Sequence, residues 1–278
     1  MRTAVVTGAG SGIGLELTRR LVREGWSVAA LVRSPVLEDT ASDDSVLAPA
    51  LDSGRLRVYR GELSDQASRS AVVGELAARE PSVDVLFNNA GASTGSPQYS
   101  AQGRELHYEV NTLAPHVLTT GLLENLAAAG GRVVNTTSNT ILALRRFDPA
   151  TLAHPAGRFR RIIGPYAASK LALTLCSHAL APALRRRDVS ILAVTPGTNA
   201  TPLVRGPGMP ATLRLLTMPL AKPPSHGAAL LIGAATGSYT SGNLVLPWSS
   251  RTPPFARLAD QTLEVVAEAV REEQSGSC

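Results

Sequence analysis

The chain has 278 residues, of which 44% are hydrophobic and 18% are charged. A chain of this length and composition can bury a large core, which excludes wholesale disorder and favours a single α/β domain over residues 1–278. The formal net charge of +5 at pH 7 comes from scattered basic residues without a recognised binding pattern, so no nucleic-acid partner is expected. No apolar run of about 18 residues occurs, so no membrane partner is expected either.

The usage of a few residue types narrows the classes further. The first residues lead directly into the apolar stretch 3–6 and leave no room for a signal peptide, so we expect a cytoplasmic location. The spacing of the 2 cysteines and 5 histidines predicts neither a disulfide framework nor a metal site. Among the 27 basic residues, only Lys170 and Lys222 are lysines, and each is a candidate for a role that arginine cannot fill.

Short apolar, β-branched runs alternate with longer amphipathic stretches along the chain, which predicts βαβ units. We expect a Rossmann-like, doubly wound parallel sheet of about seven strands, with helices on both faces because the crossovers are right-handed. The predicted strands are residues 4–7, 27–32, 56–59, 83–87, 131–136, 189–194 and 243–246. The predicted helices are residues 12–24, 66–80, 103–129, 165–187, 225–236 and 254–273.

Irregular segments interrupt this alternation. We expect residues 35–54 to form a loop or a poorly formed helix. We expect residues 272–278 to form a flexible tail. Residues 139–164 carry five arginines, and residues 198–224 mix Pro and Gly with large apolar residues. Long irregular segments in a compact domain are commonly lids or binding loops, so we expect the last two segments to cover a substrate.

Each of these two segments has an alternative interpretation. The arginine-rich segment 139–164 could be an ordinary solvated loop. In the segment after Thr201, the spacing of Leu213, Leu216 and Leu220 fits one helix face. That face either packs on the domain or covers the substrate.

A glycine-rich turn lies between the first predicted strand and the first predicted helix. Its glycines Gly8, Gly12 and Gly14 allow a tight turn and a close approach to a pyrophosphate, which would sit on the N–H groups of the helix start. Ser11 and Ile13 complete the predicted cofactor contacts of this turn. The spacing Gly8-x-x-x-Gly12-x-Gly14 differs from G-x-G-x-x-G and resembles the cofactor turn of the short-chain dehydrogenase/reductase family.

The end of the second predicted strand bears on the choice of coenzyme. Sites specific for NAD usually place an acidic residue there to bind the ribose 2′-hydroxyl, whereas a nearby arginine accommodates the 2′-phosphate of NADP. Arg33 follows this strand, and the next carboxylate is Glu38. We therefore expect Arg33 to pair with a 2′-phosphate and NADP(H) to be the coenzyme, with NAD(H) as the less favoured choice. An ordinary solvated arginine is the alternative interpretation of Arg33.

Three side chains are candidates for the chemistry. Tyr166 and Lys170 are spaced i, i+4 in a predicted helix and share one face, where the ammonium is expected to lower the phenol pKa from its usual value of about 10. Ser138 follows the fifth predicted strand at the ligand edge of the sheet, and its hydroxyl can hydrogen-bond a carbonyl or alkoxide oxygen. Thr137 is the neighbouring alternative. The Tyr-x-x-x-Lys spacing and the position of Ser138 match the catalytic residues of the family.

Other positions receive roles only through this resemblance. It makes Asn111 the fourth catalytic residue, which helps to hold a proton-relay water. It assigns the adenine contact to Glu62 and Leu63, although the family usually has Asp at the position of Glu62. The remaining cofactor contacts that it implies are Asn89, Ala90, Gly91, Tyr166, Lys170, Pro196, Gly197 and Thr201.

The connection between Ser138 and Tyr166 is longer than in most compact family members and resembles the retinol-dehydrogenase-like and carbonyl-reductase-like branches. Family members commonly dimerise through the helices that here begin near Gly103 and Pro165. The five arginines of the connection face a single acid, Asp148, which argues against burial between subunits because unpaired charges are costly to desolvate. We expect the connection to stay partly exposed near the active-site entrance, with monomer and homodimer both open.

The resemblance implies an NADP(H)-dependent oxidoreductase that interconverts a carbonyl and an alcohol on a small substrate. Tyr166 would exchange the proton and Ser138 would hold the oxygen. The large apolar residues after Thr201 favour an apolar ketone, aldehyde or secondary alcohol. Two alternatives stay open, a regulatory or scaffold protein that binds NADP(H) without turnover and an epimerase or dehydratase.

Overall fold

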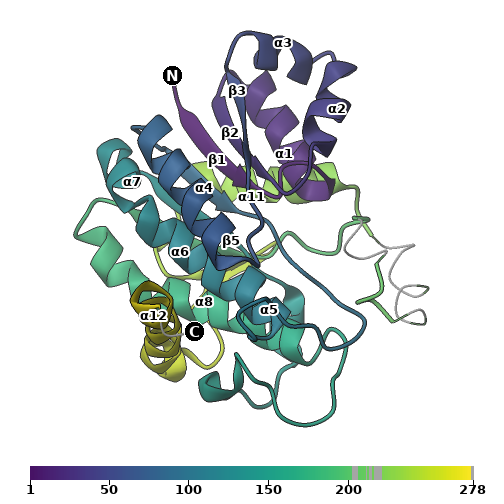
Figure 1. Cartoon of the computed structure of the whole chain (residues 1–278), viewed down its shortest axis with the longest axis vertical. Helices are drawn as coiled ribbons and strands as arrows, with labels where there is room; N and C mark the ends of the chain where they lie inside the picture. The colour runs from purple at the N-terminus through teal and green to yellow at the C-terminus, as the bar shows by residue number, and fades with distance from the viewer. Residues whose placement is uncertain (202–205, 211, 213–214, 216–220, 277–278) are drawn as a thin grey trace.

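Eight strands form one sheet, in the order β3-β2-β1-β4-β5-β6-β7-β8, among the residues that the structure describes (Figure 1). This computed structural model describes residues 1–201, 206–210, 212, 215 and 221–276. The strands are β1 (Thr3–Thr7), β2 (Ser27–Val32), β3 (Leu56–Arg60), β4 (Val85–Asn88), β5 (Arg132–Thr136), β6 (Ser190–Val194), β7 (Leu244–Leu246) and β8 (Ser249–Arg251). The first seven pair in parallel, and β8 pairs antiparallel with β7 at the edge.

The strand order reverses beside β1. Val5 of β1 pairs with Ala29 of β2 on one side and with Leu86 of β4 on the other. From β1 the chain therefore builds the sheet first in one direction, through β2 and β3, and then in the other direction from β4 onward. In open α/β sheets, ligands bind at such a switch point, outside the carboxyl ends of the strands.

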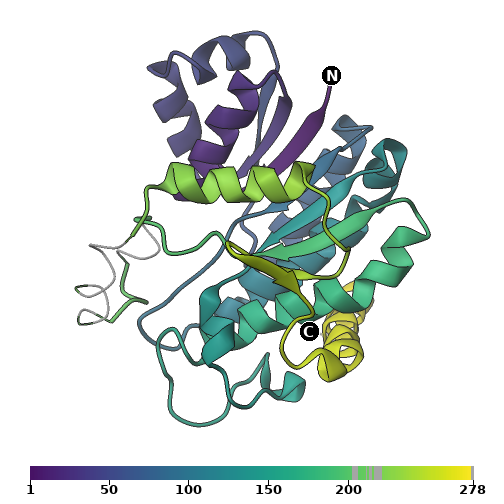
Figure 2. The same ribbon diagram turned by 180° about the vertical axis from the view of Figure 1, so that it is seen from behind.

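Helices cover both faces of the sheet, as the sequence predicted (Figures 1 and 2). On one face α1 and α11 pack with Val6 of β1, and on the other face α4, α6 and α8 pack with Val5. Neighbouring residues of β1 are thus both apolar, because a parallel strand is buried on both sides. The helices and helical turns are α1 (Gly12–Arg23), α2 (Val36–Ser42), α3 (Leu47–Asp52), α4 (Gln66–Arg79), α5 (Leu106–Tyr108), η1 (Glu109–Leu113), α6 (Ala114–Gly121), α7 (Leu123–Ala129), η2 (Asn139–Ala143), η3 (Pro149–Thr151), α8 (Pro165–Arg185), α11 (Pro224–Thr236), η5 (Ala256–Leu258) and α12 (Ala259–Ser275).

The helix predicted at residues 103–129 is instead the series α5, η1, α6 and α7. Gly103 has a φ of 79° and lies outside it, and the first turn begins after Glu105, whose carboxylate accepts a hydrogen bond from the Tyr108 backbone N–H. The π-helical turn η1 precedes Pro115, which lacks the N–H that an α-helix would donate to the Asn111 carbonyl. Sequence periodicity did not reveal this break.

Three further expectations need correction. Residues 35–54 contain the two short helices α2 and α3. The tail predicted to be flexible from residue 272 continues α12 as far as Ser275, and α12 packs on α8. The additional strand β8 was missed because its three residues are all exposed, so no apolar alternation marks it. The apolar face proposed for Leu213, Leu216 and Leu220 lies outside the described residues.

Candidate active site

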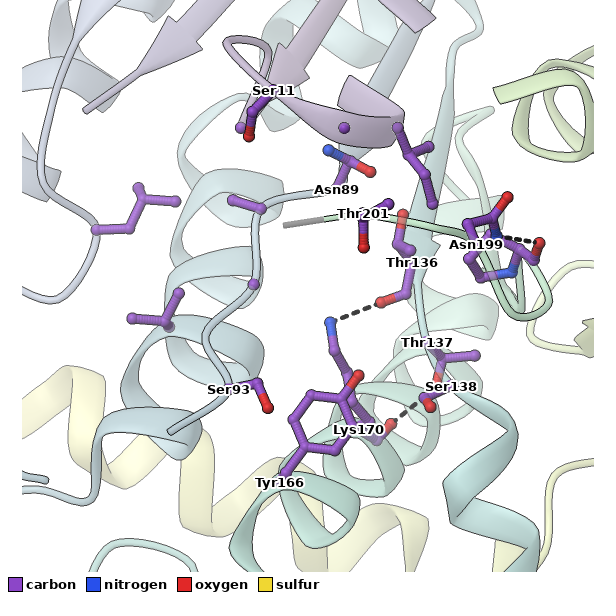
Figure 3. A pocket seen from close by; sticks show the side chains of 18 of the residues that line it. Ser11, Asn89, Ser93, Thr136, Thr137, Ser138, Tyr166, Lys170, Asn199 and Thr201 are labelled. Carbon is purple, nitrogen blue, oxygen red and sulfur yellow. Dashed lines mark hydrogen bonds between the residues drawn. The ribbon is translucent and has the colours of Figure 1, made fainter. Parts of the chain in front are cut away.

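The carboxyl ends of β1, β4, β5 and β6 surround a cavity of about 560 Å³ at the switch point (Figure 3). Most of the site residues predicted from the sequence meet there. The predicted residues that line the cavity are Gly8, Ser11, Gly12, Ile13, Arg33, Glu62, Leu63, Asn89, Ala90, Gly91, Ser138, Tyr166, Lys170, Pro196, Gly197 and Thr201. Gly14 and Asn111 are not among the lining residues.

The glycine turn joins β1 to α1 at one end of the cavity. Gly8 has a φ of 66°, a left-handed conformation that favours glycine, and its N–H donates to the Leu31 carbonyl. A Cβ on Gly14 would collide with the Gly8 carbonyl oxygen. Gly14 therefore has a structural role, because it lets the first turn of α1 pack directly against the loop that faces the cavity.

Arg33 and Glu62 lie together after the ends of β2 and β3, at the side of the cavity where the family resemblance places the adenosine. The Arg33 Nε is 3.9 Å from the Glu62 Oε2, and the Arg33 side chain is 80% exposed. Glu62 is held in its loop because its Oε1 accepts hydrogen bonds from the Ser64 backbone N–H and hydroxyl, at 3.0 and 2.8 Å. Arg33 is thus loosely paired and free to turn toward an anionic group.

Ser138 rather than Thr137 presents its hydroxyl to the cavity. The Thr137 Oγ1 is buried against α8, where it bonds the Lys170 carbonyl at 3.1 Å and the Thr174 Oγ1 at 2.9 Å. Ser138 is the N-cap residue of η2, and its Oγ accepts a hydrogen bond from the Thr140 hydroxyl at 3.0 Å. This geometry resolves the choice between neighbours that the sequence left open.

Tyr166 and Lys170 stand on the first turns of α8 and point into the cavity (Figure 3). The Lys170 Nζ donates a 2.8 Å hydrogen bond to the Thr136 carbonyl at the end of β5. Its side chain is almost fully buried, and desolvation lowers the pKa of Lys170 to about 8. Desolvation raises the pKa of Tyr166, although a hydrogen bond with Ser138 acts in the opposite direction.

The direction for Tyr166 corrects a sequence-based expectation. The ammonium of Lys170 was expected to bring the phenol pKa down toward neutrality, but burial is the larger influence and the pKa goes up. The phenol is therefore protonated at neutral pH in this structure. A protonated phenol is the form that can donate a proton to a carbonyl oxygen.

Asn111 lies in the π-helical turn η1 and is fully buried. Its Oδ1 accepts from the Ala92 N–H at 2.8 Å, and its Nδ2 donates to the Ala92 carbonyl at 3.1 Å and to the Ser169 Oγ at 3.0 Å. These bonds fix the loop after β4 against α8. The role of Asn111 in holding a relay water stays a prediction.

The loops after β4 and β6 are held by asparagine side chains. The Asn89 Nδ2 donates to the Thr7 carbonyl at 3.1 Å, which ties the loop after β4 to the end of β1. In the loop after β6, the Asn199 Nδ2 donates to the Pro196 carbonyl at 2.8 Å, and its Oδ1 accepts from the Gly227 N–H at 3.0 Å. Asn199 was not singled out from the sequence, because its role depends on contact with α11.

Several residues that line the cavity were missed by sequence reasoning. Ile162, which is β-branched, has a φ of 64° and is 9% exposed, so packing holds it in a conformation that such residues avoid. The segment was flagged only as irregular, and nothing local identified its lining residues. Missed residues that line the cavity include Ser93, Val110, Asn139, Thr140, Ile162 and Met209.

The arginine-rich segment 139–164 lies beside the cavity, as expected. Its five arginines are all solvent-exposed. The Arg161 Nε donates to the Gly95 carbonyl at 3.0 Å, which connects the segment to the loop after β4. Asn139, Thr140 and Ile162 from the same segment line the cavity, so the segment is partly exposed and adjoins the site. Its place at the substrate entrance stays a prediction.

Two features are absent from the described part of the chain. No group of three His, Cys, Asp or Glu side chains is placed to hold a metal ion. No described helix combines the length and the apolar character needed to cross a bilayer.

The residues present fit a nicotinamide dinucleotide. The loop at Gly8 and the start of α1 form a backbone cradle at the switch point, which suits a pyrophosphate. The Thr136 carbonyl takes one of the three donors of the Lys170 ammonium, which leaves donors for ribose hydroxyls. A dinucleotide laid from Arg33 across this cradle would end beside Tyr166, so fold and site define a dinucleotide-dependent oxidoreductase.

Comparison with known proteins narrows this class. A family model described as short chain dehydrogenase matches residues 2–145. Mouse retinol dehydrogenase 12 is 32% identical over 238 residues, which cover 82% of this chain and 71% of that protein. The chain therefore belongs to the short-chain dehydrogenase/reductase family, and the predicted resemblance to its retinol-dehydrogenase-like branch is confirmed.

Solved structures agree on the fold. A short-chain dehydrogenase from Sphingobium yanoikuyae, in complex with NADPH, has a TM-score of 0.67 at 21% identity and covers 98% of this chain and 96% of its own. A blue fluorescent protein from a metagenomic library, also in complex with NADPH, has a TM-score of 0.68 at 26% identity and covers 88% of this chain and 96% of its own. The Rossmann-like architecture predicted from the sequence is thus confirmed.

Proposed function

We propose that this oxidoreductase uses NADP(H) to interconvert a carbonyl and an alcohol on a small apolar substrate. The observation that carries the proposal is the meeting of Ser138, Tyr166 and Lys170 at one end of the cavity, with Arg33 at the other. When bound, the nicotinamide supplies or accepts the hydride. The chain's own residues bind, orient and exchange the proton.

The roles of the three side chains follow from their contacts. Tyr166 is protonated and beside Ser138, so it donates the proton to the carbonyl oxygen in reduction and takes it back in oxidation. Ser138 hydrogen-bonds the same oxygen and fixes its position relative to the phenol. Lys170, anchored on the Thr136 carbonyl, binds the ribose hydroxyls and keeps its positive charge close to the phenol.

The coenzyme preference rests on Arg33. Its guanidinium is loosely paired with Glu62 at 3.9 Å, and among the described residues that line the cavity Glu62 supplies the one carboxylate. The 2′-phosphate of NADP(H) can pair with the Arg33 guanidinium in place of Glu62, and this attraction offsets the repulsion between the phosphate and the Glu62 carboxylate. Complexes of similar structures with NADPH support this choice.

The substrate class rests on the end of the cavity opposite the adenosine side. Val110, Ile162 and Met209 contribute apolar side chains to the lining of the cavity, and we assign them to this end. The similarity to mouse retinol dehydrogenase 12 supports an apolar alcohol or aldehyde. A long or branched apolar chain attached to the reacting carbon fits such a wall, because burial of apolar surface drives its binding.

A coenzyme-coupled screen tests the proposal. The purified chain is given NADPH or NADH with a panel of aliphatic, aromatic and polyene aldehydes and ketones, and coenzyme oxidation is followed. We expect turnover with NADPH on apolar members of the panel. Tight NADPH binding without turnover on any member of the panel would instead support the regulatory or scaffold alternative.

A further inference from the structure

Four charged side chains meet in the interior behind the cavity, and none of them lines it. They are Arg69 of α4, Arg104 in the loop before α5, Glu109 of η1 and Glu273 of α12. The side chains of Arg69 and Glu109 are 0% exposed, and those of Arg104 and Glu273 are 7% and 6% exposed. We call these four residues the buried charge cluster.

The two arginines and the two carboxylates form a closed set of contacts. Arg69 reaches the Oε1 of Glu109 at 2.7 Å with Nη1 and the Oε1 of Glu273 at 2.6 Å with Nη2. Arg104 donates from Nε to the Oε2 of Glu109 at 2.7 Å, and its Nη2 contacts Glu273. Each carboxylate thus pairs with both arginines, and the loss of one member leaves a buried charge uncompensated.

The cluster touches the cavity from two directions. The Arg69 Nη1 also donates to the Leu63 carbonyl at 2.9 Å, and Leu63 lines the adenosine side of the cavity. Glu109 is the first residue of η1, the turn that carries the cavity residue Val110 and the buried Asn111. One buried arginine therefore connects the coenzyme loop with the turn that fixes Asn111.

The fourth member comes from the far end of the chain. Glu273 lies in the last turn of α12, and the Gln66 Nε2 donates to its backbone carbonyl at 2.8 Å, which fastens this turn to the start of α4. Attachment of a helix alone needs no buried charges, since apolar residues of similar volume serve as well or better. The contact of Arg69 with the Leu63 carbonyl indicates that the buried charges also position the coenzyme loop.

We propose that Glu273 is a positioning residue for the coenzyme site. By pairing with Arg69 and Arg104, it holds Arg69 between the Leu63 carbonyl and Glu109, so that the adenosine loop and η1 keep their relative placement. The inference rests on the proposed function only because it names NADPH as the ligand whose affinity changes when Glu273 is altered. It makes coenzyme affinity depend on a helix that contributes no described residue to the cavity.

The test compares two neutralising substitutions on one helix turn. Glu273→Gln keeps the shape and removes the charge, while Glu272→Gln makes the same change at an exposed neighbour. NADPH affinity is measured by fluorescence titration, well below the melting temperature of each variant. We expect Glu273→Gln to raise the Kd about tenfold, the scale of one charge-assisted hydrogen bond, and Glu272→Gln to leave it unchanged.

Two further readouts separate positioning from simple fastening. Amide hydrogen exchange can be measured without coenzyme. It should accelerate at residues 61–65 and 109–113 in Glu273→Gln and stay unchanged in Glu272→Gln. Glu273→Asp keeps the carboxylate and should recover part of the affinity. If Glu273→Gln fails to fold, the Asp variant takes its place, with a smaller rise in Kd expected through the same two loops.

The possible failures are distinguishable. Exchange that stays slow at residues 61–65 and 109–113, with an unchanged Kd, overturns the positioning role even if the melting temperature falls. Failure of the unaltered chain to bind NADPH or NADH contradicts the proposed function instead. Accelerated exchange without a change in Kd also overturns the proposal, because the loops then move without consequence for the coenzyme.

Discussion

The two ends of the cavity are constructed differently. The coenzyme end is formed by strand ends and the turns that directly follow them, such as the turn at Gly8, and paired strands fix their positions. The substrate end draws on Ile162 and Met209, which come from long irregular connections. A sheet thus supplies a common coenzyme frame, while the connections between its strands supply the features that distinguish one family member from another.

The largest effect should follow from removing the proton donor. Tyr166→Phe keeps the ring and deletes the hydroxyl, so kcat should fall by at least about 10²–10⁴. NADPH affinity, measured by titration, should stay close to that of the unaltered chain. Normal turnover by this variant would mean that another residue is the acid.

The second effect concerns the lysine. Lys170→Arg should lose most of its activity, because a bulky planar guanidinium cannot occupy the buried space of a compact ammonium beside the Thr136 carbonyl. The matched control is Lys222→Arg, which alters the other lysine of the chain at an exposed position. Steady-state kinetics on both variants checks the contrast, and equal losses would remove any special role for Lys170.

The third effect is confined to the adenosine side. Arg33→Ala should weaken NADPH binding by about 1.5–3 kcal/mol, the scale of hydrogen bonds to charged groups, and barely affect NADH. Arg60→Ala is the control, since Arg60 ends the neighbouring strand β3 and pairs with Glu38 outside the cavity. Titrations with both coenzymes decide, and a loss shared equally by NADPH and NADH would refute the 2′-phosphate contact.

A smaller change is expected at the substrate end. Ile162→Gly suits the φ of 64° and removes an apolar wall, so kcat/KM for bulky substrates relative to small ones should shift about tenfold while NADPH affinity is kept. Ile163→Gly, at the exposed neighbour, should leave the ratio unchanged. Competition between a small and a bulky aldehyde measures this ratio directly. An altered NADPH affinity of Ile162→Gly would contradict the separate roles of the two ends.

A further effect is a dependence of stability on pH. Burial lowers the pKa of Lys170 to about 8 from its ordinary 10.5. Between these values the unfolded chain binds the proton more tightly than the folded chain, so the Lys170 contribution to the free energy of unfolding rises with pH. Below about pH 8 the folded chain carries the full penalty of a buried ammonium.

Lys170→Met should remove this contribution. Urea midpoints measured from about pH 7 to 10.5 should rise less steeply for Lys170→Met than for Lys222→Met, and the two curves should converge at the alkaline end. Parallel curves would show that burial of the Lys170 ammonium does not lower the stability of the folded chain.

Sequence patterns predicted the coenzyme end because its signals are local. The spacing of Gly8, Gly12 and Gly14 and the i, i+4 spacing of Tyr166 and Lys170 each fit within a turn or two of chain. The buried charge cluster could not be predicted in this way, since only the fold brings Glu273 and Glu109 to the same arginine, Arg69. Periodicity also failed at η1, where a single proline changes the hydrogen-bond pattern, and at β8, where exposed residues carry no apolar signal.

Transfer of an isotope from the coenzyme tests hydride transfer by this chain. NADPH carrying deuterium at both positions of nicotinamide C4 is incubated with the chain and an apolar aldehyde that the coupled screen has identified. Mass spectrometry of the alcohol should find the label on the former carbonyl carbon, with none transferred by Tyr166→Phe beyond its residual turnover. Alcohol formed without the label would contradict the account, because the reducing hydrogen would then come from a source other than the coenzyme.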